Sequence, residues 1–251
     1  MKLLTRLRHI PQRFATFTIL SIVALGILVP STAFAATNST HTCAPTDTQC
    51  FISAGDQFIA LRQTALTTLS GKVTARENQH LISSDQSNVL QSDISTNQSG
   101  LAALKSKLDA ETNPQGARQD VANIFFQFRI FAVVLPRDYR RLYLDIAVNV
   151  DIKLRSLGPS VQQAINKAPA GEQAQLNTLF SDYKNQLSTA ESQFDLAQAD
   201  FPALTPANFN YNRSTYQTTL SNLDTAEHTI HTALKQAGND LHQIAQILKG
   251  K

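Results

Sequence analysis

Apolar side chains recur every three or four residues along most of this 251-residue chain, the spacing of one face of an α-helix. The clearest series run from Leu176 to Phe201 and from Tyr216 to Leu248, where intervals of four and three alternate. A helix of about 30 residues is about 45 Å long and buries such a seam only against other helices. The pattern predicts an all-α fold, an elongated antiparallel helical bundle with coiled-coil-like heptad packing.

Helix starts and breakers divide the bundle, which we expect over residues 47–251. A capping pattern at 46–49 starts the first helix, and a second seam runs from Leu90 to Leu108 with the polar Asn97 on it. Prolines and glycines then mark the breaks between segments. We expect loops near residues 82–85, 112–116, 135–138, 158–160, 168–171 and 202–213.

One segment carries two conflicting periods. From Leu144 to Leu154 large apolar residues alternate with polar residues or alanine, which is typical of a strand, while a spacing of three and four also fits a helix. A hairpin through 136–140 is the alternative, but no other strands are present to complete a sheet, so we favour a helix. Such a helix is apolar on two sides, and its second stripe, Leu144, Val148 and Ile152, is our candidate contact surface.

The first 35 residues have the features of a secretory signal peptide. Four basic residues precede the uncharged apolar run 14–29, and Ala33-Phe34-Ala35 has the small-residue pattern of a cleavage site. We expect cleavage after Ala35, and an uncleaved N-terminal membrane anchor is the alternative. Either result places the rest of the chain outside the cytoplasm, secreted or at the cell surface.

Charge and cysteines agree with export. The formal net charge is +3, but the chain beyond residue 35 holds 18 basic and 19 acidic residues, so it offers no general attraction to nucleic acid. We expect residues 36–46 to be an exported tail, in which Cys43 is placed to pair with Cys50 in an oxidising compartment. That disulfide would tie the tail to the first turn of the first helix.

A family resemblance supports this interpretation. Arg129-Ile130-Phe131 followed by Leu135-Pro136 is similar to an Arg-Val-Tyr…Leu-x-x-Pro pattern, with Phe131 in the place of the usual tyrosine. The pattern occurs in a broad group of uncharacterised, secreted, helical bacterial proteins. Leu204-Thr205-Pro206 and the seam of the last helix also resemble that group. The resemblance implies an exported helical bundle and assigns no functional residue.

Two constellations carry candidate chemistry. Arg129, Arg137, Arg140, Arg141 and Tyr139 belong to the densest basic and aromatic stretch, where guanidinium groups could hold an anionic glycan, a phosphate polymer or a lipid headgroup. The alternative is that these arginines pair with nearby acids while the aromatic rings fill the core.

The second constellation is a metal candidate. Asp224, His228 and His231 lie along one face of the last helix and could ligate a transition metal, although one helix rarely supplies a whole site. The alternative is a polar flank beside the seam.

No nucleotide-binding, metalloprotease or serine-hydrolase motif occurs in the sequence. We therefore expect a non-enzymatic structural or protein-interaction module of the bacterial cell envelope or the cell exterior, needing no cofactor. Its expected partner is another envelope protein or a second copy. Membrane contact is expected only through an uncleaved signal segment.

Overall fold

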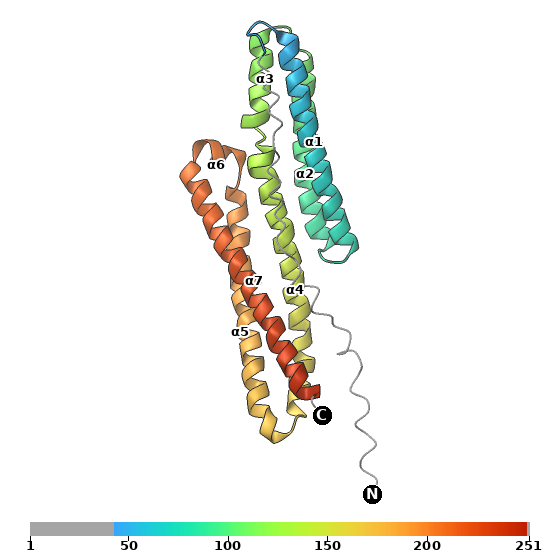
Figure 1. Cartoon of the computed structure of the whole chain (residues 1–251), viewed down its shortest axis with the longest axis vertical. Coiled ribbons are helices and arrows are strands. Elements are labelled where there is room, and N and C mark those ends of the chain that lie inside the picture. Colours follow the sequence, from blue (N-terminus) through green and yellow to red (C-terminus); the bar gives the residue numbers. More distant parts are fainter. Residues whose placement is uncertain (1–42, 250–251) are drawn as a thin grey trace.

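The computed structural model describes residues 43–249 and is all-helical over that range. Figure 1 shows the helices lying side by side along the long axis of the molecule. The long helices and their short connections have these bounds: α1 Thr48–Asn78, α2 Ser84–Asp109, α3 Pro114–Phe126, the π-helix η3 Ile130–Val134, α4 Leu135–Asn166, α5 Ala170–Asp200, the 3-10 helix η4 Phe201–Ala203, α6 Pro206–Tyr211 and α7 Arg213–Lys249.

The helices begin where side chains can bond their free backbone N–H groups. Asp47 accepts from the backbone N–H of Cys50, and Ser83 and Gln86 form a reciprocal capping box at α2. Asn113 and Thr205 cap α3 and α6, and in both cases a proline occupies the next position. Proline fits there because the first helical N–H has no partner within the helix.

Cys43 and Cys50 form a disulfide, as the sequence predicts. Closing a loop this short stabilises the folded chain by about 2–2.5 kcal/mol in the chain-entropy model. We expect Cys43→Ala/Cys50→Ala to lower the free energy of unfolding in urea by about 2 kcal/mol. Reductant should have the same effect on the natural chain and none on the variant; an equal midpoint for all four samples would contradict the prediction.

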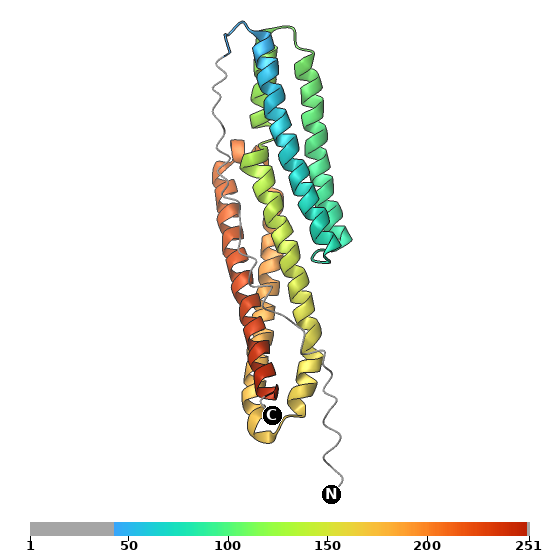
Figure 2. The ribbon, with the colours of Figure 1, turned by 45° about the vertical axis from the view of Figure 1, so that its right-hand side comes forward.

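α4 is shared by two groups of helices. α1, α2 and α3 lie along the upper part of the molecule, and α5 and α7 lie along the lower part, with α4 running between them (Figures 1 and 2). The upper core contains Leu142 and Ile146 of α4, whereas the middle core contains Leu144 and Ala147. A third core joins the lower half of α4 to α5 and α7.

Burial of α4 on two sides explains its ambiguous sequence. Successive apolar residues of the alternating segment turn toward different cores, so the alternation arises from a doubly buried helix and the hairpin alternative is wrong. The seams of the other helices are buried as expected; Phe180, Leu187 and Leu241, for example, all lie in the lower core.

Two expected loops are wrong because helix continues through them. At 135–138 α4 has already begun, and the break lies earlier, at residues 127–129, where Arg129 has a φ of 47°. Pro136 lies in the first turn of α4, directly after η3. Proline lacks an N–H and crowds the carbonyl four residues before it, and the wider π turn gives that carbonyl room.

At 158–160 helix α4 runs through Pro159 to Asn166. An internal proline costs about 3 kcal/mol, but Val161 and Ile165 are buried beyond it, and each contributes about 1.5–3 kcal/mol. Gly158 also reduces the strain, because it has no Cβ to clash with the proline ring. The expected linker 202–213 is likewise partly helical, since it contains α6.

Candidate interaction groove

An open groove of about 590 Å³ lies where the upper and lower helices meet beside α4. We call it the junction groove. Its lining comes from α2, α4, the end of α5 and η4, segments that are far apart in the sequence. The lining residues are Asp85, Gln86, Val89, Asp93, Arg137, Arg141, Leu144, Asp145, Val148, Phe194, Gln198, Phe201 and Pro202.

The predicted contact stripe of α4 leads into this groove. Leu144 is buried in the middle core and Val148 is half-buried against it, and both line the groove. Ile152, one turn further along α4, is 56% exposed. The stripe therefore is not buried as a whole within the chain, and across the groove Val89 of α2 adds a further exposed apolar side chain.

The rim of the groove is polar and nearly balanced in charge. Three aspartates and two arginines line it. Arg137 pairs with Asp138 at 2.8 Å and with Asp93 at 3.4 Å. Asn149 donates to the side-chain oxygen of Gln86 at 2.8 Å, which fixes α2 against α4.

Two carboxyls of α4 at this junction have perturbed acidity. Burial raises the pKa of Asp138 to about 6, and it outweighs the opposing charge of Arg137 at hydrogen-bond distance. Burial likewise raises the pKa of Asp145 to about 6, against the charge of Arg141 and a hydrogen bond with Gln86. Both carboxyls therefore favour the protonated form more than free aspartate does.

The structure does not bring the predicted arginine cluster together. Arg137 and Arg141 face the junction groove, whereas Arg140 contacts Asp224 at 2.6 Å and Glu227 at 3.0 Å on α7. Arg129 donates to Asn210 of α6 at 2.8 Å.

Tyr139 packs on the upper core, and its ring centre lies 4.9 Å from Lys72 Nζ. Arg140 and Arg141 are adjacent, so their side chains leave α4 in directions about 100° apart. Arg137 and Arg140 are each paired with acids of their own, Arg137 with Asp93 and Asp138 and Arg140 with Asp224 and Glu227. A single anion site built from all five residues is therefore wrong.

The metal candidate is not supported either. Within residues 43–249 no group of three His, Cys, Asp or Glu side chains is placed to hold a metal ion. Asp224 is paired with Arg140, and His228 and His231 are exposed on the outer side of α7. No facing helix adds ligands there, as bundle metal sites require.

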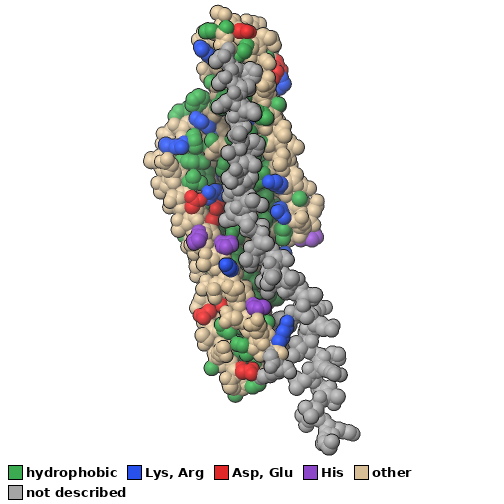
Figure 3. Space-filling view, viewed as in Figure 1, with side chains coloured by type: hydrophobic (Ala, Val, Ile, Leu, Met, Phe, Trp, Pro, Cys, Tyr) green, Lys and Arg blue, Asp and Glu red, His purple; other side chains and the backbone are tan. Residues whose placement is uncertain are grey.

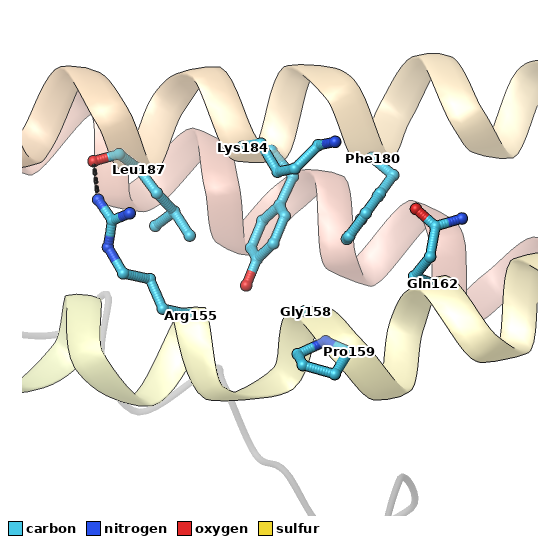
Figure 4. A pocket seen from close by; sticks show the side chains of 8 residues that line it. Arg155, Gly158, Pro159, Gln162, Phe180, Lys184 and Leu187 are labelled. Atoms are coloured by element: carbon cyan, nitrogen blue, oxygen red, sulfur yellow. Dashed lines mark hydrogen bonds between the residues drawn. The ribbon is translucent and has the colours of Figure 1, made fainter.

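A second cavity, of about 480 Å³, lies between the lower part of α4 and α5 (Figure 4). It lies beside Gly158 and Pro159, and Figure 4 shows Arg155 bonded to the backbone oxygen of Leu187. Arg155 also pairs with Asp151 and Glu191, while Lys184 Nζ lies 4.9 Å from the ring centre of Phe180. Its cations are thus already engaged, and we interpret the cavity as loose packing beside the proline.

Sequence reasoning missed the α2 side of the groove and one buried cation. Asp85, Gln86 and Asp93 meet α4 only through the fold, and no local pattern marks them. Arg62 had a signal, because it interrupts the stripe between Ile59 and Leu66 at helical spacing and is nevertheless buried.

The chain matches no protein-family model, no curated protein and no solved structure. Within the described range, no helix is both long and apolar enough to cross a bilayer.

Proposed function

We propose that the protein is an exported, non-enzymatic helical module of the bacterial cell envelope or exterior, and that its junction groove binds an amphipathic helix of a partner protein. The observation that supports this most is the groove itself, with an apolar floor, a polar rim and two exposed apolar side chains, Val89 in its lining and Ile152 one turn beyond Val148. An apolar helix face laid into such a groove is a common mode of peptide recognition.

Export is supported by two features. Residues 1–35, which lie outside the described residues, have the composition of a signal peptide, and the Cys43–Cys50 disulfide is compatible with an oxidising compartment. In our proposal the helices pack as an elongated antiparallel bundle with coiled-coil-like contacts. In such a scaffold α4 would hold the floor of the groove in place before any partner arrives.

The charge balance of the rim favours a protein over a polyanion. A phosphate polymer or anionic glycan would need several unpaired cations, but the groove has three carboxylates beside its two guanidinium groups. The apolar floor, including Leu144, Val148 and Phe194, instead matches side chains spaced every three or four residues on a helix. A partner helix would bring mixed charges to the rim.

Site-specific photocrosslinking in the producing cells tests the proposal. A benzophenone amino acid at Ile152 should crosslink to one partner, whereas the same group at Leu196 of α5, 57% exposed and away from the groove, should not. Val89→Asp should lower the crosslinked yield by about tenfold, because it removes an apolar contact and adds a charge. The crosslinked partner peptide should bind the purified chain and be helical when bound.

Equal crosslinking from Ile152 and Leu196, or an adduct that survives Val89→Asp, would refute the docking site. An adduct between two copies of this chain, with a matching dimer in sedimentation, would show that the groove binds a second copy and not a different protein.

A further inference from the structure

We infer that the chain has a second contact surface, at the break between α3 and α4, that binds an anionic lipid bilayer. This surface, the cation–aromatic shoulder, consists of Phe126, Arg129, Phe209, Tyr211 and Arg213. It lies on the side of α4 next to α6 and goes beyond the partner binding proposed for the junction groove. Figure 3 shows hydrophobic and basic side chains side by side over α6 and the adjoining part of α7.

Cations and rings alternate through the shoulder. The Arg129 guanidinium lies 5.0 Å from the ring centre of Phe126 and 4.9 Å from that of Phe209. The Arg213 guanidinium also lies over Phe209, 3.8 Å from its ring centre, so two arginines share this ring. Such contacts hold guanidinium groups in place without neutralising their charge.

Among the described residues, neither Arg129 nor Arg213 forms an ion pair with an acid. Arg129 is the one charged residue in the stretch 121–136, and Arg213 is the one charged residue in 201–223. Both stretches lie wholly within the described residues. In contrast, the α4 arginines Arg137, Arg140 and Arg155 all have carboxylate partners. The positive charge of the shoulder is therefore available to an anion from outside the chain.

Arg62 of α1 adds a buried positive charge beside the neighbouring rings of Phe125 and Phe131. It is 6% exposed, its Nη1 donates to the backbone oxygen of Phe58, and its Nε has no hydrogen-bond partner. Its guanidinium lies 4.5 Å from the ring centre of Phe125 and 5.2 Å from that of Phe131. The two rings and the carbonyl offset only part of the cost of burying this cation, which adds to the positive potential next to the shoulder.

The backbone is also unusual at this point. Arg129 has a left-handed φ of 47°, which side chains other than glycine adopt at a cost, and the π-helix η3 follows immediately. Asn210 locks the turn from α6, because it accepts from Arg129 Nε at 2.8 Å and donates to the backbone oxygen of Phe126 at 2.7 Å. Strained residues held by their surroundings are frequent at binding sites.

A bilayer is the occupant that fits both parts of the shoulder. Phe126 is 55% exposed and offers an apolar ring to the acyl boundary, and Tyr211, 83% exposed, is of the kind that favours the headgroup level. The unpaired arginines suit the phosphate oxygens of anionic headgroups. With no bilayer-crossing helix among residues 43–249, this contact would be peripheral.

Binding to lipid vesicles tests the inference, with protein purified in the form that its producing cells export. Partition onto phosphatidylcholine vesicles containing phosphatidylglycerol should exceed partition onto pure phosphatidylcholine and should weaken with added salt.

Arg129→Gln/Arg213→Gln should lower partition onto the anionic vesicles about 25-fold, since each arginine near such a surface contributes about fivefold. The matched control Lys235→Gln/Lys249→Gln, which removes two exposed charges elsewhere, should change it less than twofold, well below that effect. All variants share one N-terminus, so a retained leader would affect them equally.

A fluorescent reporter tests the same contact without the charge variants, which could bind less simply because they fold less well. The chain has no tryptophan, so Phe126→Trp gives a single emission that should shift to the blue on anionic vesicles. Leu196→Trp, equally exposed on α5, should not shift. Equal partition of the two charge variants, or no shift at position 126, would overturn the inference. Binding of soluble polyphosphate with the same affinity as vesicles would also overturn it.

Discussion

Acidification from pH 8 to pH 5 should stabilise the folded chain, raising the free energy of unfolding by about 3 kcal/mol. The effect comes from three carboxyls, the buried Asp138 and the half-buried Asp145 on α4 and the half-buried Glu227 on α7. Burial raises the pKa of Glu227 to about 7, against the charge of Arg140 at 3.0 Å. The neighbouring Asp224 raises it further.

The direction of this pH dependence follows from whether the folded or the unfolded chain binds each proton more tightly. Each of the three carboxyls has a higher pKa in the folded chain than in the unfolded chain, so the folded chain takes up protons first as pH falls. The stability gained is complete below about pH 4, where the unfolded carboxyls are protonated too, and it is lost as pH rises through 6 to 7. One pKa unit corresponds to about 1.4 kcal/mol, and we reduce the sum because each carboxyl is coupled to an arginine.

Urea unfolding at several pH values measures this dependence. Glu227→Gln should remove the part of the slope nearest pH 7, and Asp138→Asn should flatten it near pH 6. Asp47→Asn, at the exposed start of α1, serves as a control outside the junction. Stability that falls steadily from pH 8 to pH 5 would show that the arginines, and not burial, determine the acidity of these carboxyls.

Local patterns were sufficient to predict the helices but not how they are grouped. The apolar residues of α7 recur regularly at helical spacing, and any packing partner would bury them, so the helix and its buried face could be predicted without knowing the partner. The break at Arg129 was misplaced to Pro136 because proline is the stronger local signal, while the αL turn depends on Asn210, 81 residues away. Tertiary contacts decided the position of the break.

The candidate site was predictable only on α4. The alternating segment marked Leu144, Val148 and Ile152 as a second apolar face, and the groove lies there. The arginines could not be assigned from sequence, because one turn of helix separates Arg137, which faces the groove, from Arg140, which faces α7. Which acid each one meets depends on the packing of α2 and α7 against α4.

Leu90→Ala and Leu176→Ala should each destabilise the chain by about 3 kcal/mol, but in different halves. Both leucines are fully buried, Leu90 of α2 in the upper core and Leu176 of α5 in the lower core. Truncation removes apolar contacts and leaves a cavity that tightly packed neighbours fill only in part. Native-state amide hydrogen exchange, which reports local opening, measures the effect helix by helix.

Because the two cores share only α4, we expect the two variants to open separate units. Leu90→Ala should speed exchange in α1 and α2 and leave α5 and α7 protected, and Leu176→Ala should do the reverse. The exposed Leu196→Ala should change neither half. Equal acceleration of all helices by both variants would mean that α4 couples the halves into one cooperative unit. The junction groove would then open only when the whole chain unfolds, whereas independent halves would allow a partner helix to widen it by moving α2 relative to α5.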